Sequence, residues 1–289
     1  MKNQVNISVI MPIYNEEKYL ADQLKALANQ QYDGSWELIL VNNRCTDDSM
    51  KIAKDYSASF SKIMLIDALK KQGRPHALNK GIKMASGDAV LFTDAHCIVA
   101  PDWLNKMADA LSKYDFVAGG VDIERLNSDA PNRTQPFTGS QRKFLGFLPF
   151  CIGANMGISM KALNEIGGFC EEAIIGEDAD ISFRLQLAGY TLYDQPDAVV
   201  HMRYRESVVG LLRQTYKYAF AHPFLYKRFR KHGMKKRKKS RILKGYFEIA
   251  KHILTWMSKT PKEKQLCLRS MAANWGRIMG SIHYRVLYL

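Results

Sequence analysis

Residues 73–97 read GRPHALNKGIKMASGDAVLFTDAHC, a helical pattern over Pro75–Ala85 that leads into an apolar strand over Ala89–Thr93. A short strand with no polar alternation is typical of a sheet covered by helices on both faces. The polar residues Asp94 and His96 follow this strand directly. They are therefore expected at the carboxyl edge of the sheet, where open α/β folds bind their ligands.

The same alternation extends to both sides of this stretch. Apolar strands are predicted at Val5–Ile13, Glu37–Asn42, Lys62–Ile66 and Phe116–Val121, and helices at Glu16–Gln30, Asp47–Tyr56 and Pro101–Lys113. Strands and helices at this spacing predict an α/β fold with a mostly parallel, Rossmann-like sheet flanked by helices. Because crossovers are right-handed, the loops after the strands are expected along one edge.

The second half of the chain is less regular. Residues 122–150 show few periodic signals and are expected to form a substrate-facing loop, followed by a helix at 177–188 and edge strands at 191–193 and 198–201. From residue 206 the pattern is helical, with an apolar stripe over Ile242–Met257. We expect a catalytic domain over residues 1–205, with a nucleotide half up to about residue 120 and an acceptor half from about 121, and a helical extension over 206–289.

Positive charge is concentrated in this extension. Residues 201–289 hold 22 Lys and Arg against 3 acidic residues, whereas residues 1–200 hold 20 against 25. A basic tail favours an anionic partner. Because the basic residues flank amphipathic helices, including the run Lys235–Lys239, an anionic membrane surface is expected and a nucleic acid is not. The alternative is that the Ile242–Met257 stripe packs on the catalytic domain.

Composition excludes several classes of protein. Hydrophobic residues make up 47% and charged residues 24% of the 289, as in globular proteins. No apolar run approaches the ~18 residues of a membrane span. The 5 cysteines lack CxxC spacing, so neither a disulfide framework nor a zinc site is expected. Without a secretory signal pattern, we expect a cytoplasmic protein that is peripheral on the inner face of the cell membrane.

The strand ends carry the candidate chemistry. Neither GxGxxG nor GxxxxGK[ST] is present, which excludes a dinucleotide-binding fingerprint and a P-loop. A nucleotide diphosphate at the sheet edge would need a divalent cation, and Asp94 and His96 offer it an oxygen and an imidazole ligand. The structural alternative is that these two residues cap the next turn.

Seven segments, in this order and spacing, resemble inverting family 2 glycosyltransferases, which have the GT-A fold. They are SVIMPIYNEEKYL (8–20), VNNRCTDDS (41–49), residues 73–97, PDWL (101–104), IGGF (166–169), GEDADISFRLQLAGY (176–190) and VVHMRYRES (199–207). The likeness covers residues 6–218. It implies metal-dependent transfer of a sugar from a nucleotide-sugar donor to a hydroxyl of a glycan or lipid-linked acceptor, in cell-surface or exopolysaccharide biosynthesis.

The resemblance also implies roles for individual residues. The nucleotide is expected to contact Pro12, Tyr14, Glu16, Asn43, Arg74, Asp94 and Ala95. The metal ligands implied are Asp94, His96 and His201. Glu177 and Asp178 form the implied catalytic pair, with Asp178 as the base, and the acceptor is expected at Glu177 and Asn155.

Structural alternatives exist for the same residues. Glu177 and Asp178 could complement a helix dipole as first-turn acids. His201 and Asn155 could be buried structural groups, and Arg74 could extend into solvent.

Three departures from the family pattern refine these expectations. His96 replaces the second Asp of the DxD motif, as in a subset that resembles succinoglycan-type transferases with a DAH motif. An imidazole ligand favours Mn²⁺ over Mg²⁺. Asn42 and Asn43 stand where an Asp is usual, which leaves the nucleotide open. The QxxRW motif of polymerising members is reduced to residues 214–218, QTYKY, which favours addition of a single sugar.

Two other functions compete with this one. A sugar-1-phosphate nucleotidylyltransferase would use a related sheet, but it needs a glycine-rich basic loop after the first strand, and PIYNEEKYL offers none. A non-enzymatic protein that binds an anionic surface or a nucleic acid through the basic tail is the other alternative.

Overall fold

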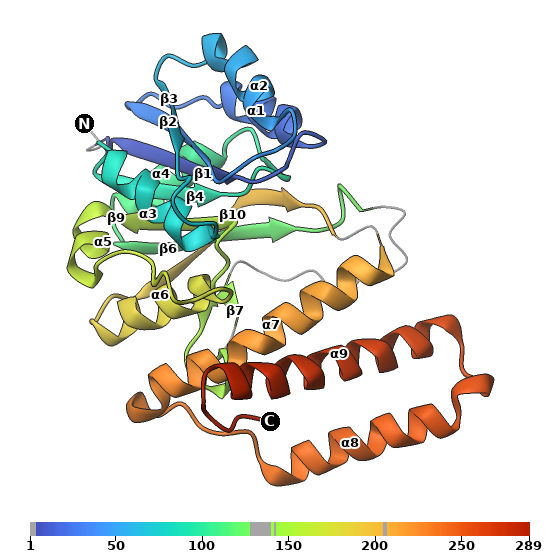
Figure 1. The fold of residues 1–289 in the computed structure, drawn as a ribbon. Helices are drawn as coiled ribbons and strands as arrows, with labels where there is room; N and C mark the ends of the chain where they lie inside the picture. The colour runs from blue at the N-terminus through green and yellow to red at the C-terminus, as the bar shows by residue number, and fades with distance from the viewer. Residues whose placement is uncertain (1–3, 128–139, 142, 205–206) are drawn as a thin grey trace. The chain divides into compact units, whose positions relative to one another are not determined.

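The computed structural model describes residues 4–127, 140–141, 143–204 and 207–289, and the chain divides into two compact units. The first comprises residues 1–144, 148–172 and 177–204, and the second comprises residues 145–147, 173–176 and 205–289. Figure 1 labels most of the helices and strands in both units.

An eight-stranded sheet organises the first unit, in the order β3-β2-β1-β4-β9-β6-β10-β5. Its strands are β1 (Ile7–Ile13), β2 (Trp36–Asn42), β3 (Ile63–Asp67), β4 (Ala89–Thr93), β5 (Cys97–Val99), β6 (Phe116–Asp122), β9 (Asn155–Ser159) and β10 (Leu192–Met202). Strands β1 to β4 pair in parallel, whereas β9 is antiparallel to both β4 and β6. The helices are α1 (Leu20–Ala28), α2 (Ser49–Asp55), α3 (Arg74–Met84), α4 (Trp103–Leu111), α5 (Met160–Ile166) and α6 (Glu177–Leu187). A small second sheet pairs β7 (Ser140–Gln141) with β8 (Phe150–Cys151).

Both faces of the large sheet are buried. Val9 and Met11 of β1 belong to one apolar cluster, and Ile10 between them belongs to the other. Side chains alternate across a strand, so this division places a core on each side of the sheet. The mixed α/β fold with a helix-flanked sheet, predicted from the sequence, is confirmed.

Three features of the sheet differ from the sequence expectation. The two edge strands predicted at 191–193 and 198–201 are one strand, β10, and it lies between β6 and β5 rather than at an edge. Its pairing with β6 shifts between Gln195 and Val199, next to Pro196, which has no N–H for a regular ladder. Strands β5 and β9 were not predicted. The expected loop over 122–150 lies partly outside the described residues.

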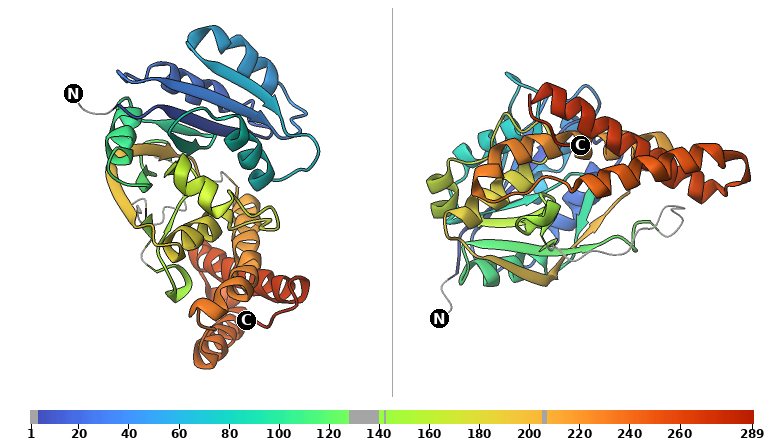
Figure 2. Two further views of the ribbon diagram at one scale, coloured as in Figure 1. Left: turned by 90° about the vertical axis from the view of Figure 1, so that its left-hand side faces the viewer. Right: turned by 90° about the horizontal axis from the view of Figure 1, so that it is seen from below.

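Three helices dominate the second unit: α7 (Val208–Phe229), α8 (Lys239–Leu254) and α9 (Pro261–His283). Thr260 and Glu263 form a capping box at the start of α9, with Pro261 at its first position. Gly276 of α9 lies against the Tyr216 carbonyl of α7, at a distance that leaves no room for a Cβ. Figure 2 shows α7 and α9 side by side in both of its views. None of the helices in the described part of the chain combines the length and apolar character that a bilayer crossing requires.

Candidate active site

The predicted polar loops lie at the carboxyl ends of adjacent parallel strands. In the register of β1 and β2, Ile13 is opposite Asn42, so both strands end level with each other. Glu16, in the loop after β1, approaches His96 after β4, with 3.2 Å between Oε1 and Nδ1. Tyr14, two residues before Glu16 in the same loop, is 49% exposed. Pro12, within β1, is half-buried. The loops expected to hold a nucleotide therefore meet at one edge of the sheet.

Asn43 shapes the loop that leads to α3. Its buried amide donates to the carbonyls of Ala68 and Lys71 at 3.0 and 3.1 Å, and its Oδ1 accepts from the Gly73 N–H at 2.8 Å. Arg44 donates to the carbonyls of the same loop, at Leu69 and Lys70. The side chain of Asn43 thus braces residues 68–73 and delivers Arg74 to the sheet edge.

Arg74 connects two acidic groups that are far apart in the sequence. Its guanidinium lies 2.7 Å from Asp94 Oδ1 and 2.8 Å from Glu177 Oε1, and it donates to the Gly153 carbonyl at 3.0 Å. Burial acts to lower the pKa of Arg74, but the two carboxylates outweigh it and raise the pKa above its ordinary value. Arg74 therefore stays charged and holds the loop after β4 beside the start of α6. The alternative of a solvated Arg74 is wrong.

Asp178, next to Glu177, has an unusual acidity. Burial, followed by the negative charge of Glu177, raises its pKa to about 7, although Arg74 and a backbone N–H from Ala179 act in the opposite direction. A carboxyl group with a pKa near neutrality can both hold and release a proton at physiological pH. This arrangement gives the site a candidate general base.

A divalent cation fits part of the predicted ligand set. Ligand atoms of Asp94, His96 and Cys97 lie within 4.8 Å of one another. Cys97 is fully buried, and burial raises the pKa of its thiol well above the ordinary value, so it remains protonated and is a poor ligand. Asp94 and His96 are left as an oxygen and a nitrogen donor, a combination that suits Mn²⁺.

His201 is held differently from the expectation. Its Nδ1 lies 2.6 Å from Asp122 Oδ2, and its Nε2 lies 3.2 Å from a guanidinium nitrogen of Arg125. The structure does not bring it into the cluster of Asp94 and His96 among the residues described. Its two ring nitrogens instead join the ends of β6 and β10.

Asn155 braces the sheet instead of facing an acceptor. It is fully buried; its amide donates at 2.7 Å to the carbonyls of Gly120 and Ala198, and its oxygen accepts from Trp103 Nε1 at 2.7 Å. A side chain with these three contacts has no exposed group to offer a substrate. The prediction of an acceptor contact is corrected to the structural alternative. Ala95 is likewise buried, so only its backbone is suited to contact a nucleotide.

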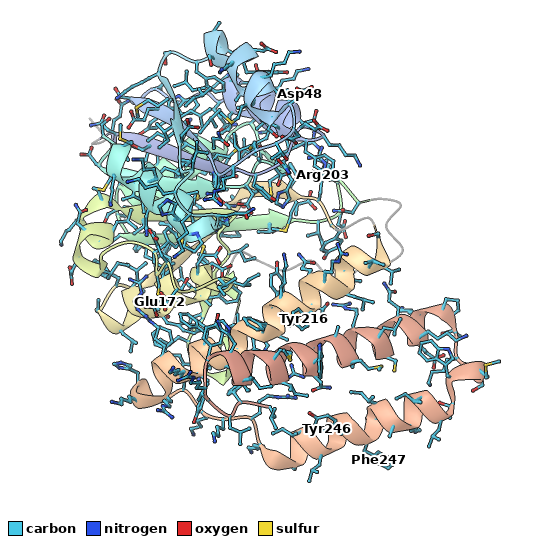
Figure 3. All side chains as sticks on the ribbon, viewed as in Figure 1. Asp48, Glu172, Arg203, Tyr216, Tyr246 and Phe247 are labelled. Atoms are coloured by element: carbon cyan, nitrogen blue, oxygen red, sulfur yellow. The ribbon has the colours of Figure 1, made fainter. Side chains whose placement is uncertain are left out.

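Two further residues of the site were not predicted. Arg203, labelled in Figure 3, donates to the His96 carbonyl at 3.1 Å and to Asp22 at 2.7 Å. Asp122 orients His201 from the end of β6. Asp122 is the last residue of the buried strand β6, and a carboxylate at the end of an apolar run was the available signal. Nothing local in the sequence marks Arg203, because its partners lie far away along the chain.

Comparisons with known proteins identify the family of the chain. A family model described as "Glycosyl transferase family 2" matches residues 8–167, and one described as "Glycosyl transferase family group 2" matches residues 89–280. Glycosyltransferase AglE of Haloferax volcanii is 28% identical over 198 residues, which cover 67% of this chain and 65% of the relative. A poly-beta-1,6-N-acetyl-D-glucosamine synthase of Staphylococcus epidermidis is 24% identical, covering 74% of this chain and 53% of the relative. The chain thus spans about half the length of that synthase.

Solved structures show the same fold. Mannosyltransferase PcManGT from Pyrobaculum calidifontis, in complex with GDP-Man and Mn²⁺, superimposes with a TM-score of 0.62 at 17% identity, over 96% of this chain and 74% of that one. TarS of S. aureus in complex with UDP gives 0.57 at 18% identity, over 98% and 93%. At such identities the likeness concerns the fold alone, and it confirms the expected GT-A architecture. Because the first family model matches more than half of the chain, the protein belongs to glycosyl transferase family 2, as its seven sequence segments predicted.

Proposed function

We propose that this protein transfers a sugar from a nucleotide-sugar donor to a hydroxyl of a glycan or lipid-linked acceptor, with inversion at the anomeric carbon. The observation that carries the proposal is the bridge made by Arg74. It joins Asp94, in the loop suited to a diphosphate, to Glu177, beside the candidate base Asp178. Direct displacement at a sugar carbon needs these two functions close together, because the acceptor loses a proton as the diphosphate leaves.

Four residues of this chain have separate roles in the proposed reaction. Asp178 accepts the acceptor proton, and its pKa of about 7 lets it do so near neutral pH. Glu177 and Asp94 keep the Arg74 guanidinium in place at the boundary between donor and acceptor. A fixed positive charge at that position favours the negative charge that develops on the leaving diphosphate.

Asp94 and His96 are the proposed ligands of a divalent cation, with Mn²⁺ favoured, so that DAH takes the place of DxD. When bound, the cation would neutralise the negative charge of the leaving diphosphate. PcManGT, and GalNAc-T7 with UDP, GalNAc and Mn²⁺ at a TM-score of 0.57, are neighbours in the fold whose structures contain this ion.

A thermal-shift screen tests the donor site. We expect UDP, GDP, dTDP or CDP to raise the melting temperature of the protein in the presence of Mn²⁺, because a ligand that binds only the folded state stabilises it. Asp94→Ala is expected to remove the Mn²⁺-dependent part of the shift, and the exposed Asp33→Ala serves as the control. A shift of equal size in Asp94→Ala, with and without EDTA, would refute the metal role.

The names of the relatives point to the process in which the transferred sugar is used. Putative glycosyltransferase EpsE of Bacillus subtilis is 28% identical over 231 residues, and the synthase described above makes a polysaccharide by its name. We propose a role in polysaccharide biosynthesis with addition of a single sugar, since only a degenerate QxxRW motif is present at residues 214–218.

We further propose that residues 1–205 are the catalytic domain and that the extension over 206–289 lies on the cytoplasmic face of an anionic membrane. The apolar stripe of α8 supports this, because its members face solvent: Leu243 is 70% exposed, Phe247 68% and Leu254 87%. Figure 3 labels Tyr246 and Phe247 on this helix. An exposed apolar face next to a basic run is the pattern of an interfacial helix. Each nearby Lys or Arg adds about 1 kcal/mol of attraction to anionic lipids.

Co-sedimentation with phosphatidylglycerol vesicles tests the membrane proposal. Phe247→Glu and Leu254→Glu are each expected to lower the partition coefficient about tenfold or more, since burying one such side chain contributes about 1.5–3 kcal/mol. Val209→Glu on α7, where the side chain is 58% exposed, introduces the same charge away from the stripe. If this control lost as much binding as Phe247→Glu, or if the unmodified protein stayed in the supernatant at low salt, the proposal would fail.

A further inference from the structure

Two arginines of the helical unit, Arg237 and Arg277, have no acidic partner among the residues that the structure describes. Arg237 precedes α8, and Arg277 lies on α9. Burial, followed by the positive charge of Arg237, lowers the pKa of Arg277 to about 10. Among the described residues, Nη1 of Arg237 and Nε of Arg277 are buried and have no hydrogen-bond acceptor. Two like charges held together in this way disfavour the folded state.

Two partly buried arginines of the other unit, Arg74 and Arg184, have a full set of acceptors. Arg74 has two carboxylates and a carbonyl, and Arg184 has Asp180 and the carbonyls of Ile166 and Gly168. By contrast, the only acceptor that Arg277 has among the described side chains is the amide oxygen of Asn274. The groups that act on Arg277 are Arg237 and two tyrosines, Tyr288 and Tyr246, with no carboxylate among them. The unsatisfied charge is therefore a property of this place and not of buried arginines in this fold.

The surroundings are suited to an anion. Burial, followed by the charges of Arg277 and Arg237, lowers the pKa of His222 to about 3, so the positive charge at this place comes from the two guanidiniums. The tilted rings of Tyr226 and Tyr288 lie with 5.0 Å between their centroids, and Lys236 lies 6.0 Å from the Tyr226 ring. Guanidinium N–H groups bind phosphate oxygens through charge-assisted, often bidentate hydrogen bonds.

We propose that Arg237 and Arg277 form a binding site for a phosphate group, carried by a lipid headgroup or by a soluble phosphate compound. The site lies wholly within the helical unit, so the proposal does not depend on the proposed transfer reaction. Residues 201–289 hold 22 lysines and arginines. The proposal assigns a specific ligand to two of them, and the others contribute only to the overall positive charge of this part of the chain.

Binding of inorganic phosphate to the full chain, without divalent metal, tests the soluble form. Phosphate is expected to raise the melting temperature, and Arg237→Gln and Arg277→Gln to weaken its affinity about tenfold, the loss of one charge-assisted hydrogen bond. Lys262→Gln, at an exposed position on α9, removes the same charge and is expected to change nothing. The lipid form is tested by binding to phosphatidylglycerol vesicles with the same variants.

The outcomes separate the sources. Loss of phosphate binding with unchanged vesicle binding identifies a soluble ligand, and the reverse identifies a headgroup. Without phosphate or lipid, both Gln variants are expected to melt at or above the temperature of the unmodified protein, because the repulsion is relieved. Lower melting temperatures of both variants without ligand, together with vesicle and phosphate binding equal to those of Lys262→Gln, would overturn the proposal.

Discussion

Asp178→Asn is expected to lower the rate of sugar transfer by about 10²–10⁴-fold, the usual contribution of a general base. Asparagine keeps the size of the side chain but cannot accept the acceptor proton. Nucleotide affinity should remain close to that of the unmodified protein, since the nucleotide is expected at Asp94 and Arg74, and Asp178 is assigned to the acceptor proton. The measurement is initial transfer rate together with calorimetric nucleotide binding. The control is Glu172→Gln, which neutralises an exposed acid, labelled in Figure 3, before α6. A folded Asp178→Asn protein with a rate within a few-fold of Glu172→Gln would remove Asp178 from the mechanism.

The raised pKa of Asp178 predicts two pH effects. Transfer should fall as pH drops below about 7, because the base becomes protonated. Stability should change in the opposite sense. The folded protein retains a proton that the unfolded chain releases above its ordinary pKa of 3.8, so ionisation of Asp178 destabilises the fold as pH rises from about 4 to 7. Asp178→Asn is therefore expected to melt at a higher temperature than the unmodified protein at pH 8, with little difference at pH 4.

Arg74→Ala is expected to lower the free energy of unfolding by about 3 kcal/mol or more, because it leaves two partly buried carboxylates without their counter-charge. Asp94 and Glu177 are 20% and 11% exposed, so solvent screens them only in part. Urea denaturation measures the loss as a lower midpoint with an unchanged slope.

Arg74→Lys is the matched variant for this experiment. It keeps the charge but cannot reach both carboxylates and the Gly153 carbonyl with one ammonium group. An intermediate midpoint is expected. Equal midpoints for Arg74→Ala and the unmodified protein would mean that the bridge does not contribute to stability.

The strands that the sequence predicted share one property. β1, β2 and β4 are mostly apolar, without regular polar alternation, and their burial on both faces can be read from local composition. β9 carries no such signal. It begins with Asn155 and contains Gly157, whose missing Cβ leaves room for Leu91, Leu111 and Met107 around it. Only its pairing with β4 and β6, distant in the sequence, makes it a strand.

The site residues likewise divide into those that local sequence reveals and those that depend on contacts distant in the sequence. The positions of Asp94, His96, Glu177 and Asp178 could be predicted, because each directly follows a strand or begins a helix. Their connection through Arg74 could not, since Arg74 lies 20 and 103 residues from its two partners. The family resemblance implied a nucleotide contact for Asn43 and an acceptor contact for Asn155. In the structure their amides satisfy backbone groups that no sequence pattern reveals.

The contacts of Asn43 and Arg44 with the loop over residues 68–73 have a practical consequence for redesign of donor preference. A library that randomises this loop alone would leave both side chains facing carbonyls whose positions had changed. Exchange with a homologous enzyme should therefore transplant residues 42–44 and 67–73 together, as a single cassette. Chimaeras that split the cassette are expected to express poorly, and chimaeras that keep it whole to inherit the nucleotide choice of their source.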